Sequence, residues 1–203
     1  MKNTVCCFLL LFCCGVAHAD SGTLAQQVLA ETNAARQNPQ RYAQYIREFK
    51  RSFIGKGYRL PGSLDVVMTS EGKGALDEAV RFLARQRPLP ALSWSPELAK
   101  AADELVREQT ASGETGHGER GDMKKRIEKY GSWRSSIGEN ISYGPDTARQ
   151  VVMGLIIDDG VPDRGHRKNV FDRSFTTAGI ACGPHPLYRT ICVTDFAGGF
   201  KGR

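Results

Sequence analysis

The sequence predicts an α+β fold in which helices cover an antiparallel sheet. Apolar residues recur at helical spacing over most of the stretch from residue 23 to residue 158. The last third instead alternates apolar and polar side chains in two short runs, 177–183 and 189–196. Helices gathered early in a chain and strands gathered late are typical of α+β domains. At 203 residues, the chain is long enough for one domain with a sizeable core.

The N-terminus has the pattern of a secretory signal peptide over residues 1–19. An apolar run, 5–16, is followed by the small-residue cleavage site Ala17-His18-Ala19. We therefore expect a mature chain that begins at Asp20 and is secreted or periplasmic. The apolar run is shorter than the ~20 residues that a spanning helix requires. No transmembrane anchor is expected in the mature chain.

Removal of the signal peptide leaves two of the six cysteines, Cys182 and Cys192. In an oxidising compartment, two cysteines this close in sequence are expected to form a disulfide. Alternation along the two last strands makes them a cross-strand pair, a geometry that a disulfide can span. The alternative is a lipoprotein that retains Cys13 or Cys14 as its anchor.

The chain is moderately basic, with a formal net charge of +6. Its basic residues are scattered and form no nucleic-acid-binding motif, so no specific nucleic-acid partner is expected. The charge is compatible with contact to an anionic cell surface, and equally with ordinary solubility.

Capping residues and apolar periodicity place the remaining elements. Asn38 before Pro39 and Ser95 before Pro96 are typical helix starts. A glycine-rich stretch, 55–74, is expected to be irregular. The expected helices are 23–37, one that begins at residue 39, one around 76–83, 92–113, 122–130 and 146–158, with a helical turn near 64–68 and a strand over 137–143.

Three segments carry the side chains that suit chemistry. His117 lies between two glycines, His166 lies in a predicted loop after a helix that ends in Asp158 and Asp159, and Glu139 lies within the predicted strand. Glu139 shares its side of that strand with two isoleucines, so burying it requires a partner. Two imidazoles with one or two carboxylates suit an open zinc-type site. His117 and His166 are the candidate ligands, and Glu139 is a further one.

Other catalytic schemes lack their residues. No Gly-x-Ser-x-Gly nucleophile elbow is present, and the disulfide leaves no free thiol. Neither His-x-x-x-His nor Cys-x-x-Cys spacing occurs. The metal hypothesis therefore depends on residue types and not on ligand spacing.

Four ordered motifs resemble the CAP superfamily, which comprises the cysteine-rich secretory proteins, antigen 5 and the pathogenesis-related proteins, and is also called SCP-like. The Gly-His-Arg-x-Asn form is similar to the bacterial branch. The resemblance covers about 24–36 and 92–200. It implies an α-β-α sandwich with a central cleft that holds two His and two acids and, in some members, zinc. The motifs are Leu92-Ser93-Trp94, Gly116-His117, Gly138-Glu139-Asn140-Ile141 and Gly165-His166-Arg167-Lys168-Asn169-Val170.

The resemblance assigns three cleft positions to His117, Glu139 and His166. The family's second acid is usually a Glu on the helix before the second His, and here Asp158 or Asp159 takes that place. Residues 37–91 have no counterpart and are predicted to be an insertion within a single domain, 20–203.

The resemblance implies a secreted module whose cleft binds a divalent metal of the zinc type, or a small apolar molecule, lipid or peptide. One alternative is a metal-dependent hydrolase, with Glu139 and His166 as the catalytic candidates. The other alternative is a structural cell-surface interaction module in which the same residues form a buried polar network.

Overall fold

The computed structural model describes residues 23–59, 64–119 and 122–203, so the predicted signal peptide lies outside the described residues. The helices are α1 (Leu24–Gln37), α2 (Pro39–Phe49), the 3-10 helix η1 (Lys50–Ser52), α3 (Lys73–Arg85), α4 (Pro96–Ser112), α5 (Asp122–Tyr130), α6 (Ala148–Ile157) and α7 (Gly165–Val170). The strands are β1 (Phe53–Ile54), β2 (Gly57–Tyr58), β3 (Val67–Met68), β4 (Ser93–Trp94), β5 (Gly131–Ser132), β6 (Ile137–Tyr143), β7 (Thr177–His185), β8 (Arg189–Ala197) and β9 (Lys201–Gly202).

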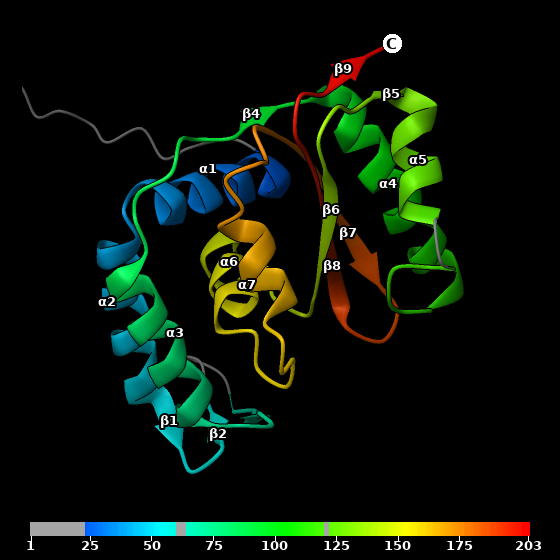
Figure 1. Ribbon diagram of the computed structural model, residues 1–203. Coiled ribbons are helices and arrows are strands. Elements are labelled where there is room, and N and C mark those ends of the chain that lie inside the picture. Colours follow the sequence, from blue (N-terminus) through cyan, green and yellow to red (C-terminus); the bar gives the residue numbers. More distant parts are fainter. Residues whose placement is uncertain (1–22, 60–63, 120–121) are drawn as a thin grey trace, which may run out of the picture.

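The central sheet separates two layers of helices (Figure 1). Its four strands lie in the order β4-β7-β8-β6. On one face, α4 and α5 pack through Leu98, Ala101 and Ile127. On the other face lies the largest apolar cluster, which joins α1, α2, α3 and α6 to the sheet residues Ile180 and Cys192. The predicted α+β sandwich is confirmed.

The sheet is mixed, which corrects one detail of the prediction. β7 pairs with β8, and β6 pairs with β8, both antiparallel as expected. The edge strand β4, however, pairs parallel to β7 through Ser93 and Trp94. The sequence 92–113 was expected to be helical throughout, but the chain is extended before Ser95. There the Ser95 hydroxyl accepts the Leu98 amide and begins α4.

One glycine allows α4 to lie close to the sheet. A Cβ atom on Gly179 of β7 would come within 2.1 Å of the backbone nitrogen of Ala99. Any larger side chain at this position would push the helix away from the strand. The close approach therefore sets the distance between the α4 layer and the sheet.

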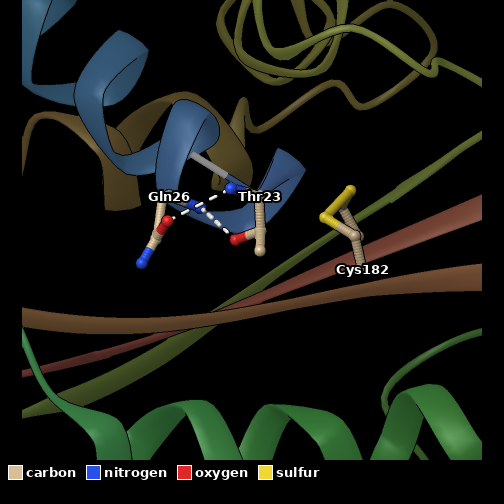
Figure 2. The surroundings of a disulfide bond; sticks show 4 residues. Thr23, Gln26 and Cys182 are labelled. Carbon is tan, nitrogen blue, oxygen red and sulfur yellow. Dashed lines mark hydrogen bonds between the residues drawn. A yellow bond between two sulfur atoms is a disulfide. The ribbon is translucent and has the colours of Figure 1, made fainter. Parts of the chain in front are cut away.

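The disulfide between Cys182 and Cys192 is confirmed. The two residues are directly opposite each other in the β7–β8 pair, with their Cα atoms 4.1 Å apart. Figure 2 shows the bond near the first turn of α1, where Thr23 and Gln26 form a reciprocal capping box. The bridge thus lies on the face of the sheet that α1 covers.

Residues 37–91, predicted to be an insertion, contribute to the main core. Leu76, Ala79 and Leu83 of α3 lie in the same apolar cluster as Val151 and Ile156 of α6. The helical turn expected near 64–68 is wrong, because Val67 and Met68 pair as β3 with β2. No helix within the described residues has the length and apolar character needed to cross a membrane.

A buried arginine joins α1 to two distant segments. Arg36 is almost completely buried, and burial lowers its pKa from the usual value. Its guanidinium donates to the carbonyl oxygen of Pro90, before β4. It also donates to those of Val170, the last residue of α7, and of Asp172 and Phe175, which follow that helix. Four carbonyl groups that would otherwise be poorly satisfied are thus bound by one side chain.

We predict that Arg36→Met lowers the free energy of unfolding by on the order of 3 kcal/mol, because buried carbonyl groups lose charged donors. Urea titration followed by circular dichroism measures the change. The control is Arg41→Met, since Arg41 is exposed on α2. Equal stability of the two variants would contradict the role assigned to Arg36.

Candidate functional site

His117 and His166 line the same cleft, although they are far apart in sequence. Their ring centroids lie 6.5 Å apart, and the ring planes are inclined by 30°. The cleft has a volume of about 380 Å³. Its lining residues are His117, Glu139, Val161, Asp163, Gly165, His166, Lys168 and Asn169.

The loop that carries His117 is held at its base by side chains. α4 ends at Gly113, which adopts a left-handed conformation, φ 75°. Gln109 donates to the carbonyl of Gly116 over 2.6 Å, and the Gly116 amide donates to the Tyr143 hydroxyl over 2.8 Å. The His117 side chain itself is 53% exposed, so the loop presents its ring to the cleft.

Glu139 of β6 connects His117 to a buried arginine. Its Oε1 lies 2.8 Å from Nδ1 of His117, and its Oε2 accepts a 2.6 Å hydrogen bond from Nη2 of Arg126. Both Glu139 and Arg126 are buried. The partner that a buried carboxylate on this strand requires is therefore a cation from α5 together with an imidazole.

Asp158 holds His166 in a similar way. Its Oδ1 lies 2.7 Å from Nδ1 of His166, while its Oδ2 accepts the backbone N–H groups of His166 at 2.9 Å and Arg167 at 3.3 Å. These amides belong to the first turn of α7, so His166 lies on a short helix and not on the loop that the sequence predicted. The glycine and proline that precede α7 are typical of loops, and for this reason no helix was predicted here.

Asp159 is directed elsewhere. Its two carboxylate oxygens accept the backbone amides of Ser70 at 2.6 Å and Glu71 at 2.8 Å. Of the two aspartates proposed for the second acid, the structure brings Asp158 to the histidine. Asp159 instead joins the cleft segment to the residues just before α3.

Two asparagines connect α7 to the central sheet. Asn140 of β6 donates to the carbonyl of His166 over 3.0 Å. Asn169 donates to the side-chain oxygen of Asn140 over 2.9 Å and to the carbonyl of Glu139 over 3.2 Å. The backbone segments that carry His166 and Glu139 are therefore fixed relative to each other.

Arg164 and Arg167 secure the loop before α7 to α3. Arg164 donates to both carboxylate oxygens of Glu71, at 2.6 and 2.7 Å, and to Glu78 at 2.8 Å. The hydrogen bonds from Arg164 lower the pKa of Glu71 to about 2. Arg167 donates to Glu78 and to the last carbonyls of α6. These contacts fix the loop from the side opposite the asparagines.

The carboxylate contacts determine which imidazole nitrogen is available. A neutral ring whose Nδ1 faces a carboxylate carries its proton there, which leaves the lone pair on Nε2. Both histidines have this arrangement. In the described part of the chain, no group of three or more His, Cys, Asp or Glu side chains is disposed to hold a metal ion. Two imidazole nitrogens are fewer protein ligands than the four of a closed structural zinc site or the three of an open catalytic one.

Asp195 of β8 is a part of this region that sequence reasoning missed. It is fully buried and paired in register with Glu139, no donor of the described residues reaches its carboxylate oxygens, and its protonated form can donate to Glu139. Burial raises the pKa of Asp195 well above its usual value, and the neighbouring charge of Glu139 raises it further. Alternation along the strand could have indicated this burial, because the Asp195 side chain lies on the same side of β8 as those of Val193 and Ala197, and β8 is buried on both faces. The burial of Arg126 could not be predicted in this way, because its helix is mostly polar.

The chain has relatives among proteins of known sequence and structure. The sequence profile of the cysteine-rich secretory protein family, CAP, matches residues 29–196. An outer surface protein from Borrelia burgdorferi is 20% identical with a TM-score of 0.46, and the match covers 55% of this chain and 80% of that chain. An extracellular protein containing an SCP domain from Bacillus anthracis is 21% identical with a TM-score of 0.43, covering 62% and 40%. The crystal structure of NaASP2 with Zn²⁺ is 14% identical with a TM-score of 0.46, covering 89% and 84%. A search of the curated proteins finds no match.

We predict that Asp195 makes the protein less stable as the pH rises. Because its pKa is raised in the folded state, folding retains a proton that the unfolded chain releases above about pH 4. The stability of the wild type relative to Asp195→Asn should therefore fall between pH 4 and pH 7 by more than ~1.4 kcal/mol, the equivalent of one pKa unit. Thermal unfolding at both pH values measures it.

The matched control is Asp146→Asn, since the Asp146 side chain is well exposed. That control should follow the wild type at both pH values. An Asp195→Asn variant with the same pH dependence as the wild type would contradict the assignment of a protonated Asp195.

Proposed function

The chain belongs to the cysteine-rich secretory protein (CAP) family, and we propose that its cleft binds one divalent cation of the zinc type together with a polar extracellular ligand. The cation would be held by Nε2 of His117 and Nε2 of His166. Glu139 and Asp158 would orient the two rings. The family is one of secretory proteins, which agrees with an extracellular place of action.

The observation that carries this proposal is the pair of carboxylate–imidazole contacts, 2.8 Å for Glu139 and His117 and 2.7 Å for Asp158 and His166. Metal-binding histidines usually donate their second ring nitrogen to a carboxylate or carbonyl, which fixes the tautomer and increases ligand basicity. Here two such pairs face one cleft. A cation bound there would supply Lewis acidity toward an oxygen of the ligand.

The lining of the cleft favours a polar ligand. Apart from Val161 and Gly165, every lining residue carries a polar or charged side chain. Lys168 offers a donor and Asp163 offers an acceptor, and both residues are exposed. A peptide with its carbonyls and carboxylates suits such a surface better than a small apolar molecule or lipid, whose burial requires apolar walls.

Ligand binding is better supported than hydrolysis. Both carboxylate oxygens of Glu139 are already engaged, one by His117 and one by Arg126, and the side chain is 1% exposed, so water has little access to it as a general base. A purely structural network is also less well supported, because His117 is 53% exposed at the cleft and its ring has few packing contacts to contribute.

We predict that the mature protein binds zinc at a molar ratio of about one. His117→Ala and His166→Ala should each weaken the zinc affinity by ten-fold or more, equivalent to ~1.4 kcal/mol. Titration calorimetry of metal-free protein measures the affinity. His185→Asn is the control, because His185 is buried outside the cleft and an asparagine oxygen can still accept the backbone amide of Leu187. Equal zinc affinity in the wild type and both alanine variants would contradict the proposed metal site.

A second prediction separates the two neighbouring aspartates. Asp158→Asn keeps an oxygen for the α7 amides but turns an N–H toward His166, which favours the tautomer with its proton on Nε2. Zinc affinity should fall by ~10–100-fold, the usual effect of losing such an orienting carboxylate. Asp159→Asn should leave zinc affinity unchanged, since among the described residues the Asp159 side chain accepts its hydrogen bonds from the backbone of Ser70 and Glu71, away from the cleft histidines. Equal zinc affinity of these two variants would contradict the orienting role of Asp158.

A further inference from the structure

The small sheet formed by β1, β2 and β3 buries one of its faces against the protein. Phe53 and Tyr58 are paired in register, and their rings contact the ring of Phe49 at centroid distances of 5.3 and 4.7 Å. Phe49, Phe53 and Tyr58 belong to the main apolar cluster or pack against it. This face is therefore part of the folded core.

The opposite face is apolar and exposed. Ile54 lies opposite Gly57, which lies opposite Met68, so these three residues share the outward side of the sheet. A Cβ atom on Gly57 would meet Val66 at 2.7 Å and the sulfur of Met68 at 3.0 Å, so both side chains lie over the glycine. The exposed fractions are 86% for Ile54, 52% for Val66 and 70% for Met68, and Leu64 nearby is 90% exposed.

This distribution is opposite to that expected of a solvated sheet. Antiparallel sheets with one face in water alternate apolar residues inward with polar residues outward. Here both faces are apolar, and the fold does not use the outer one. A contiguous exposed apolar surface of this kind marks a place where another molecule binds.

Basic residues accompany the apolar face. Residues 50–59 contain Lys50, Arg51, Lys56 and Arg59 and no acidic residue. Arg51 directly precedes β1, Lys56 lies in the turn between β1 and β2, and Arg59 directly follows β2. Figure 1 shows β1 and β2 at one end of the molecule, beyond α2 and α3. Lys50 is paired with Asp77, and the neighbouring segment 64–71 contributes two acids, Asp65 and Glu71. Four cations against these two acids leave the projecting apolar face with an excess of positive charge.

We propose that this face, formed by Ile54, Val66 and Met68 with Arg51, Lys56 and Arg59 around it, binds to the surface of an anionic lipid bilayer. Apolar side chains that enter the interface and cations that contact anionic headgroups are the two components of peripheral membrane binding. Charge complementarity selects the bilayer over a second copy of this chain, because a symmetric contact through this face would bring the same cations together.

The test is co-sedimentation of the mature protein with vesicles of phosphatidylglycerol mixed with phosphatidylcholine, compared with vesicles of phosphatidylcholine alone. Binding should require the anionic lipid and weaken as salt is added. Ile54→Ser with Met68→Ser should reduce partitioning at least ten-fold, because their apolar surface no longer leaves water. Arg51→Gln with Arg59→Gln should reduce it by about five-fold for each residue replaced.

Leu187→Ser is the matched control, because Leu187 is equally exposed, at 73%, at the turn between β7 and β8. That variant should bind the vesicles as the wild type does. All variants should keep the thermal stability of the wild type, since the altered side chains are exposed. Equal sedimentation with both vesicle types would overturn the proposal, as would wild-type binding by both double variants. Self-association that Ile54→Ser with Met68→Ser abolishes would identify a second copy as the partner and would also overturn it.

Discussion

The geometry of the cleft depends on the buried carboxylate of Asp158. This residue ends α6 in a left-handed conformation, φ 56°, which aspartate tolerates better than most residues. The turn directs its oxygens at the first amides of α7 and at the ring of His166. A negative charge at a helix N-terminus is favourable, so the contact that begins α7 also orients the histidine. The end of one helix, the start of the next and the position of a cleft residue thus have one cause.

The sheet side of the cleft has a different electrostatic basis. Glu139 is buried between the exposed imidazole of His117 and the buried guanidinium of Arg126, with the carboxyl group of Asp195 beside it. A single arginine faces two acids, and the raised pKa of Asp195 lets the group hold a proton in place of a second buried negative charge. The two halves of the cleft use the same carboxylate–imidazole contact, one supported by a helix start and the other by a buried ion pair.

Periodicity and capping residues were sufficient to predict most of the fold. The strand over residues 137–143 was predicted with the bounds it has, and Ser95 caps α4 as its sequence context indicates. The short helix α7 could not be predicted, because its six residues have no apolar period and it is held by a side chain outside it. The parallel pairing of β4 was missed for a similar reason. Two residues give no alternation, and their partner, β7, is far away in the sequence.

The residues of the site could be predicted from the sequence, but the hydrogen bonds and ion pairs that connect them could not. His117, Glu139 and His166 stood out from the sequence, and the structure brings them to one cleft. Whether Asp158 or Asp159 serves His166 depends on one turn of backbone, which no pattern in the sequence determines. Arg126 and Asp195 act through contacts between segments, and such contacts become visible only in three dimensions. The metal assignment stays a prediction.

We infer that Glu139 and Asp158 keep the protons of the two cleft histidines on Nδ1 and leave Nε2 free for a cation. Long-range nitrogen–proton correlation spectra of the ¹⁵N-labelled, metal-free protein near neutral pH report the tautomer of each ring directly. We expect the neutral form of each ring, His117 and His166, to carry its proton on Nδ1, and the Nε2 resonances to be the ones that shift when zinc is added. Rings protonated on Nε2, or Nε2 resonances that zinc leaves in place, would contradict the account.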